Sequence, residues 1–309
     1  MGTSPQQMSG RTWIDLILLA VVWGLSFLAM RLALDEIGPL TIALHRVGWA
    51  ALVLWLVLGL RGIALPRDPK AWAAFAVMGA LNNVIPFSLI AWGQLTIETG
   101  LAAILNASTA LWGVTVAALL LPQERLTRRR AIGVVLGFAG VATAIGLQSL
   151  ATLDLRSLSQ LAILVAGLSY AFASVWARLR LASLPPEAAA TGMLTCSTLI
   201  LLPLAWAVEG RPTLDMTARS WIGIGYVSIF ATAIAYLLYY RLIRAAGSGN
   251  TMLVTLLLIP VGIVAGAVVL GETLGAGAFA GFGLIALGLA VLDGRLMAKK
   301  RLAPEAPGG

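Results

Sequence analysis

Long apolar runs separated by short polar segments fill nearly the whole chain. A helix needs about 20 apolar residues to cross the hydrocarbon core of a bilayer. Runs of this kind predict ten membrane-spanning helices, joined by connections too short to hold a soluble domain. They cover approximately residues 12–33, 39–60, 70–94, 99–121, 128–148, 158–181, 186–208, 219–243, 249–271 and 275–297. Because strand-like alternation is absent, the predicted fold class is an all-α integral membrane protein.

The composition supports this fold class and excludes several functions. Hydrophobic residues make up 60% of the chain and charged residues only 11%, against about 45–50% and 25% in soluble domains. The net charge of +8 comes from short Lys and Arg clusters between apolar runs, so no nucleic-acid partner is expected. With one Cys, one His and no phosphate-binding motif, we expect no metal, no cofactor and no enzyme activity.

The distribution of Lys and Arg predicts the orientation in the membrane. Sixteen of these residues fall at one side of the predicted bundle and five at the other. Positive residues favour the cytoplasmic side. Residues 1–11 and 298–309 are therefore predicted to be cytoplasmic tails.

The chain contains an internal repeat. Gly24-Leu25-Ser26-Phe27 matches Gly167-Leu168-Ser169-Tyr170, 143 residues later, and Glu124-Arg125-Leu126 matches Glu272-Thr273-Leu274, 148 residues later. The second offset also relates two pairs of glycines, Gly133 with Gly281 and Gly140 with Gly288. The matches predict two repeats, residues 12–148 and 158–297. Because each holds five spans, an odd number, the second repeat is expected to be inverted.

Inverted repeats are typical of secondary transporters, whose substrate site lies near the middle of the membrane between the two halves. Two similar units of opposite orientation give two conformations of nearly equal energy, each open to one side. The repeat therefore favours a carrier that works by alternating access.

Short motifs along nearly the whole chain resemble the drug/metabolite transporter superfamily, in its EamA-type branch of ten-helix permeases. The matching residues are Trp23-Gly24-x-Ser26-Phe27, Pro39 with Arg46, Glu124-Arg125-Leu126-Thr127, Pro260-Val261 and Gly271-Glu272-Thr273-Leu274 with Gly281. The resemblance implies a multi-pass carrier of the bacterial inner membrane that exports amino acids, including aromatic ones, related metabolites or small amphipathic compounds. Trp112 departs from the pattern, because it occupies the repeat position of Pro260, where the family often has proline.

Ionisable residues within a span are costly and are candidates for function. Arg46 and His45 lie about two turns into the second predicted span. Arg46 could bind a substrate carboxylate, or it could reach outward and hold helix ends. His45 could relay protons, or it could be an interior histidine with satisfied hydrogen bonds.

Asn82 and Asn83 precede Pro86 in the third predicted span. The proline leaves a backbone carbonyl free in the preceding turn. An amide pair beside that carbonyl could hold the amino and carboxyl groups of an amino acid. Alternatively, the amides join helices, as Asn often does in membranes.

Aromatic residues inside the spans could line a cavity for apolar or aromatic substrates. The candidates are Trp23, Trp92, Trp112 and Tyr239. Trp112 and Tyr239 are preferred, because the resemblance implies that their helices lie next to the axis that relates the two repeats. For each of them, ordinary packing is the alternative.

Small-residue pairs and two matching helix ends complete the sequence analysis without indicating a function. The Gly133-x-x-x-Gly137, Gly262-x-x-x-Gly266 and Gly277-x-x-x-Gly281 faces allow close helix packing, within the bundle or in a weak homodimer of an otherwise monomeric protein. Glu124 and Glu272 are interpreted as structural caps or gate anchors.

The alternative function is a multidrug or quaternary-cation effluxer, perhaps coupled to protons. No acidic residue lies at the middle of a predicted span, which disfavours cation efflux. A membrane-embedded enzyme or scaffold is a third hypothesis. The expected partners are therefore a small-molecule substrate and membrane lipids.

Overall fold

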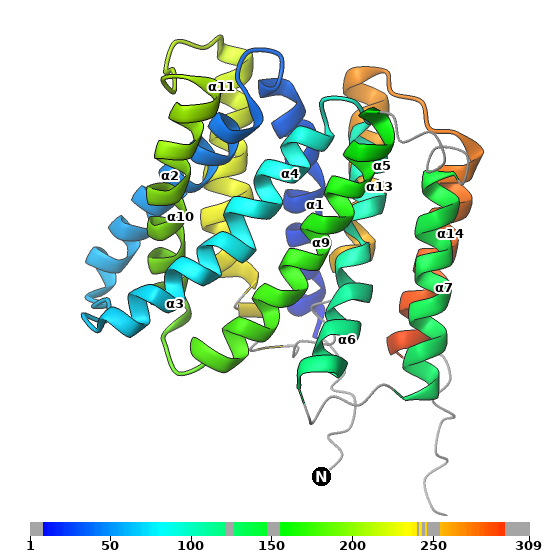
Figure 1. The fold of residues 1–309 in the computed structure, drawn as a ribbon, viewed down its shortest axis with the longest axis horizontal. Helices are drawn as coiled ribbons and strands as arrows, with labels where there is room; N and C mark the ends of the chain where they lie inside the picture. Colours follow the sequence, from blue (N-terminus) through cyan, green and yellow to red (C-terminus); the bar gives the residue numbers. More distant parts are fainter. Residues whose placement is uncertain are drawn as a thin grey trace, which may run out of the picture.

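The computed structural model describes residues 9–121, 127–146, 155–239, 241–242, 245 and 254–293. Figure 1 shows a bundle of helices that run up and down side by side. We call the end of the bundle where α1 begins the near end, and the end where α1 stops the far end. The helices are α1 (Gly10–Ala33), α2 (Pro39–Arg61), α3 (Pro69–Gly79), α4 (Ile85–Gly93), α5 (Thr99–Asn106), α6 (Ser108–Leu120), α7 (Arg128–Ile145), α9 (Leu155–Arg180), α10 (Pro186–Glu209), α11 (Ala218–Gly225), α13 (Val254–Leu270) and α14 (Ala276–Asp293), with π-helical segments η1 (Ala80–Val84) and η2 (Tyr226–Ile234).

Seven of the described helical stretches are long and apolar enough to cross a membrane, and two more, in α13 and α14, are shorter and apolar. α7 is also as long as a span but begins with the three arginines Arg128–Arg130. The described residues contain no strand. The protein is thus an all-helical, multi-pass membrane protein, while the count of ten spans stays a prediction.

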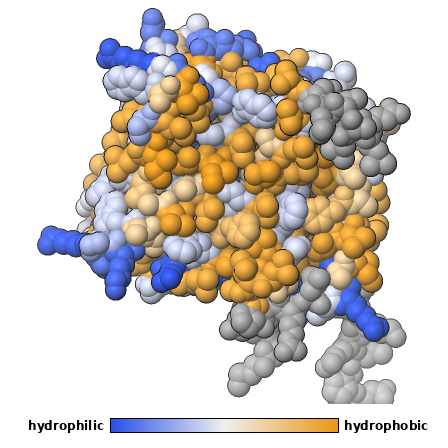
Figure 2. Space-filling view, in the orientation of Figure 1, coloured by the Kyte–Doolittle hydropathy of each residue, from blue (hydrophilic) through white to orange (hydrophobic). Residues whose placement is uncertain are grey.

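The surface of the bundle has the polarity that a bilayer requires. Figure 2 shows hydrophobic residues across the middle of one face and hydrophilic residues along its upper and lower edges. Large apolar side chains such as Leu52, Leu56 and Leu199 are strongly exposed. Lipid tails rather than water are their natural surroundings.

Local sequence explains where several helices begin and end. Asp68 caps α3 by accepting from the backbone N–H of Lys70 at 3.0 Å, and Pro69 occupies the first turn, where its missing N–H costs nothing. α2 ends at Gly62, whose φ of 64° is the left-handed conformation that glycine adopts without strain.

Two of the spans include a π-helical segment: η1 lies in Pro69–Gly93, and η2 lies in Ala218–Tyr239. A π-helical turn changes the hydrogen-bonding register, leaves carbonyls free for other partners and is frequent at functional sites. The hydroxyl of Thr232 donates to the carbonyl of Val227, five residues earlier, at 2.7 Å.

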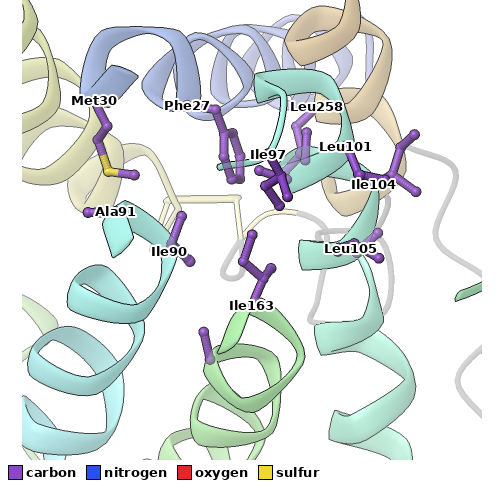
Figure 3. Packing of buried hydrophobic residues seen from close by; sticks show 14 of the residues in the cluster. Phe27, Met30, Ile90, Ala91, Ile97, Leu101, Ile104, Leu105, Ile163 and Leu258 are labelled. Atoms are coloured by element: carbon purple, nitrogen blue, oxygen red, sulfur yellow. The ribbon is translucent and has the colours of Figure 1, made fainter. Parts of the chain in front are cut away.

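The buried core lies between α1, α4, α5, α9 and α13. Figure 3 shows Phe27, Ile90, Leu105, Ile163 and Leu258 converging there from different helices. Because lipid is as apolar as these side chains, close packing rather than the hydrophobic effect holds membrane helices together.

Glycines allow α7 and α14 to approach at backbone distance. A Cβ atom at Gly133 would lie 2.7 Å from the carbonyl oxygen of Gly288, and one at Gly140 would lie 2.8 Å from that of Gly281. The two glycine pairs that the repeat relates thus face each other crosswise, and the helices run antiparallel. The Gly133 and Gly281 faces are therefore used within the bundle.

We predict that Gly288→Ala destabilises the protein by about 1–3 kcal/mol, because the new methyl group meets backbone that cannot move aside. Its Cβ would lie 2.6 Å from the backbone nitrogen of Gly137. Thermal melting of the purified protein in detergent measures the effect. Gly283→Ala on the same helix is the matched control, since nothing lies within 4 Å of its Cβ position; equal melting temperatures for the two variants would contradict the prediction.

Candidate functional site

Arg46 is buried among apolar and weakly polar groups. Its Nε donates to the Thr232 hydroxyl at 3.0 Å and its Nη1 to the Met30 sulfur at 3.3 Å. The guanidinium carbon lies 3.8 Å from the centre of the Phe87 ring, a cation–π contact. Among the described residues no carboxylate pairs with it. A guanidinium has five N–H donors, so Arg46 retains donors for an anionic group.

His45 has a partner on each ring nitrogen. The indole N–H of Trp49 lies 3.2 Å from Nδ1, and the carbonyl of Thr213 lies 3.1 Å from Nε2. An indole N–H can only donate and a carbonyl can only accept. The pattern therefore fits a neutral imidazole with its proton on Nε2. It ties α2 to the α10–α11 connection at the far end.

Asn82 and Asn83 belong to a hydrogen-bonded network that joins three spans. The Asn82 amide donates to the Tyr236 hydroxyl at 2.9 Å, and that hydroxyl donates to the Asn83 carbonyl oxygen at 3.1 Å. The Asn83 amide donates in turn to the Ser197 hydroxyl at 2.9 Å. Both asparagines lie in η1. Arg46 contacts the ring of Phe87, four residues after Asn83 in the same span, which places that cation near the network.

The span Thr99–Leu120 is interrupted near its middle, where α5 ends at Asn106 and α6 begins at Ser108. The backbone there tightens, with the N–H of Ala107 bonded to the carbonyl of Ile104 at 3.1 Å. Four buried polar atoms around this break have no hydrogen-bond partner in the described part of the protein. They are Asn106 Oδ1, Ser108 Oγ, Thr109 Oγ1 and Trp112 Nε1. We call these four residues the fourth-span polar strip.

Leaving such atoms unpaired inside a membrane costs free energy. A substrate that supplies hydrogen-bond partners recovers that cost. The strip is therefore the strongest structural indication of a binding site in the described chain. Sequence reasoning singled out only Trp112 of its members; the signal for the others is the polar sequence Asn106-Ala107-Ser108-Thr109 at the centre of an apolar run.

α9 lies between the asparagine network and the polar strip. The Ser169 hydroxyl donates to the carbonyl of Leu81 beside η1 at 2.7 Å. Two residues away, a Cβ at Gly167 would lie 3.1 Å from Ser108 Oγ and 3.2 Å from Thr109 Oγ1. The repeated motif Gly167-Leu168-Ser169-Tyr170 thus borders both polar groups. Its counterpart Gly24 packs in the same way against α13, at Leu258 and Val261.

The aromatic candidates fall in different places. Trp23 donates to the carbonyl of Ala231 in η2 at 3.1 Å, and its ring centre lies 5.6 Å from that of Tyr239. The Trp112 ring contacts Phe138 edge to face, with the centres 4.6 Å apart. Trp92 is 37% exposed, so the structure does not bring it to the polar groups. Arg46, Asn82 and Asn83 come together, Trp23 and Tyr239 form a separate pair, and Trp112 belongs to the strip.

Three glutamates at the far end cap helices of the other half of the chain. Glu209 accepts from the N–H groups of Leu40 and Thr41 of α2, both at 2.8 Å. Glu272 accepts from the N–H of Thr99 of α5 at 3.0 Å and from its hydroxyl at 2.8 Å.

Glu36 accepts in the same way from the N–H of Thr217 at 2.8 Å and from its hydroxyl. These bonds hold the pKa of Glu36 below its ordinary value, so the carboxylate stays charged at neutral pH, and this cap weakens as the pH falls through the lowered pKa. We call the contacts of Glu36, Glu209 and Glu272 the carboxylate caps. Each satisfies orphan N–H donors and the positive end of a helix dipole.

Two of the caps depend on a neighbouring glycine. A Cβ at Gly38 would lie 2.3 Å from the Glu209 carboxyl carbon, and one at Gly266 would lie 2.1 Å from Glu272 Oε2. Glu272 thus caps a helix, as the sequence interpretation proposed. Glu124, its repeat partner, lies outside the described residues.

The model of the EamA-like transporter family matches twice, at residues 11–146 and 157–292. The chain belongs to this family. Its two-repeat architecture and its membrane-transporter class follow from that membership.

Several relatives of this EamA-like chain carry the transporter description. A protein described as a probable terminal-alkyne amino-acid exporter from Streptantibioticus cattleyicolor is 28% identical over 300 residues, which cover 96% of this chain and 98% of the relative. The uncharacterized transporter YvbV of Bacillus subtilis is 26% identical, with 95% of each chain covered. The uncharacterized inner membrane transporter YedA of Escherichia coli is 26% identical, covering 74% and 73%. A solved crystal structure with 18% identity has the same fold, with a TM-score of 0.66 over 94% of this chain and 99% of that one.

We predict that Glu272→Gln lowers the free energy of unfolding by about 1–2 kcal/mol, because an uncharged amide is a weaker partner for the α5 terminus. Thermal melting at neutral pH measures this. The control is Asp35→Asn, which removes an exposed carboxylate paired with Arg31 and Arg219 and should cost less than about 0.5 kcal/mol. Equal losses in the two variants would argue against a special role for the cap.

Proposed function

We propose that this EamA-like transporter is a secondary carrier that exports amino acids, including aromatic ones, and related small metabolites across the inner membrane by alternating access. In this proposal ten spans form two inverted five-helix repeats, and both termini are cytoplasmic. The far end of the bundle then faces outward. The relative described as a probable terminal-alkyne amino-acid exporter supports amino acids as the substrate class.

The observation that carries the proposal is the fourth-span polar strip. Asn106, Ser108, Thr109 and Trp112 place unpaired donors and acceptors at the middle of a span, at a discontinuity of the helix. Discontinuous helices at mid-membrane form the substrate sites of many secondary carriers. In this proposal polar groups of the substrate, such as its ammonium group, supply the missing hydrogen bonds when the substrate reaches the strip.

Arg46 favours a substrate with a carboxylate over a cationic one. It is buried, positively charged and without a paired carboxylate in the described chain. A cationic drug at this site would meet like charge without a compensating anion, which is costly at low dielectric. The aromatic rings of Phe87 and Tyr236 beside Arg46 and Asn82 offer apolar surface for an aromatic side chain.

In this proposal the carboxylate caps hold the far end closed. All three join residues before position 148 to residues after position 155. In an alternating-access cycle these contacts must break when the far end opens, and the substrate is then released outward. The neutral hydrogen-bonded state of His45 fits a carrier driven by the substrate gradient rather than by protons.

The experiment is uptake of labelled phenylalanine into proteoliposomes, with a quaternary ammonium dye as second substrate and with or without a pH gradient. We expect phenylalanine flux that does not depend on the gradient. The double variant Asn106→Ala, Thr109→Val should reduce this flux by about tenfold, the effect of losing one or two hydrogen bonds. Thr143→Val is the matched control, since within the described residues the Thr143 hydroxyl bonds to the Ala139 carbonyl of its own helix, α7. Dye flux that requires the gradient would overturn the proposal.

A second prediction separates the role of Arg46 from that of the strip. Arg46→Gln should weaken transport of phenylalanine by about tenfold or more, because the charge-assisted pair with the carboxylate is lost. Transport of phenylalaninol, a cation that lacks the carboxylate, should not fall and should rise if anything, because the like charge of Arg46 is removed. Arg46→Lys keeps the charge and serves as the folding control. Equal losses for the two substrates would show that Arg46 acts on the bundle rather than on the carboxylate.

A further inference from the structure

A groove opens on the side of the bundle at its near end. It has a volume of about 300 Å³ and lies where the ends of α1, α2, α10 and the span containing η2 meet. Leu18, Ile234 and Leu237 form its apolar part, and Arg61, Glu187 and Arg241 its charged part.

Both arginines of the groove form ion pairs. Arg61 pairs with Glu187 at 3.1 Å, with the side chains 55% and 13% exposed. Arg241 pairs with Asp15, with side chains 49% and 12% exposed. In both pairs the carboxylate is the less exposed partner and the guanidinium is about half exposed, so the two arginines are the more accessible charges, beside the lining carboxylate of Glu187. Each ion pair uses one terminal nitrogen of its arginine, and the remaining N–H groups are available to further acceptors.

The apolar part of the groove continues onto a lipid-facing surface. Leu18 and Ile234 are exposed, as are Ile14 and Ile17 on the same helix as Leu18. Outward-facing arginines at the end of such a surface are placed at the depth of lipid headgroups. A soluble anion has no use for the exposed apolar lining, whereas a phospholipid matches both parts.

We propose that this groove binds a glycerophospholipid of the surrounding leaflet. The phosphodiester lies between Arg61 and Arg241, and an acyl chain follows Leu18 and Ile234 toward the middle of the membrane. The bound lipid fastens α1 and the η2 span to α2 and α10. This site is separate from the polar strip, so it does not depend on the transported substrate.

The test compares lipid retained by purified protein, measured by native mass spectrometry after reconstitution with phosphatidylethanolamine and phosphatidylglycerol. The charge-balanced variant Arg61→Gln, Glu187→Gln, Arg241→Gln, Asp15→Asn removes both ion pairs together and leaves no buried carboxylate unpaired. It should retain about tenfold less phospholipid than the parent protein, since each arginine near a lipid surface contributes measurably to binding. Its melting temperature without lipid confirms that it folds.

Two control variants and a competition experiment with phosphate complete the test. Arg180→Gln is the matched control, because Arg180 is exposed at the same end and contacts only the Trp176 ring in the described interactions. An equal loss of lipid in Arg180→Gln would overturn the proposal, because retention would then not depend on the residues of the groove. Displacement of the lipid by millimolar inorganic phosphate would also overturn it, since the site would then hold a soluble anion. Arg61→Lys with Arg241→Lys should retain most of the lipid.

Discussion

Polar groups inside a bilayer find no water, and this constraint shapes each level of the structure. The backbone satisfies it by forming helices. Helix ends and interior side chains then need partners from elsewhere in the chain. At the far end, the N-terminal N–H groups of α2 and α5 are satisfied by Glu209 and Glu272, each from the other half of the sequence. The same requirement that stabilises the bundle therefore also connects its two repeats.

Because the caps connect the repeats, they also resist movement of one repeat against the other. A carrier needs contacts of this kind that are strong enough to close one end and weak enough to break. A carboxylate on a helix N-terminus meets both needs, since its hydrogen bonds are charge-assisted but remain exchangeable for water when the end opens. A covalent link or a large apolar interface would not allow this exchange.

Hydropathy was sufficient to predict an all-helical membrane protein, because lipid permits few other structures. The glycine pairs of α7 and α14 were also visible in the sequence as repeat-related positions, although their crosswise contact was not. Asn82 and Asn83 stood out because amides are rare in apolar runs. Their partners Ser197 and Tyr236 lie 114 and 153 residues away from Asn83, and no local pattern predicts such contacts. Ser108 and Thr109 were missed since hydroxyls are common in membrane helices; only their lack of partners in the described structure distinguishes them.

The lack of water partners inside the bilayer also bears on the proposed mechanism, through Arg46. Its guanidinium belongs to α2 and its hydroxyl partner Thr232 to η2, so this hydrogen bond also joins the two halves. The hydroxyl and the Met30 sulfur are weak acceptors for a buried cation. In the proposed carrier a substrate carboxylate is a stronger acceptor, and its arrival favours pairing with the substrate over the Thr232 contact between the repeats. In the proposed carrier, loading the site thus loosens the connection between the repeats, and this couples binding to the change of access.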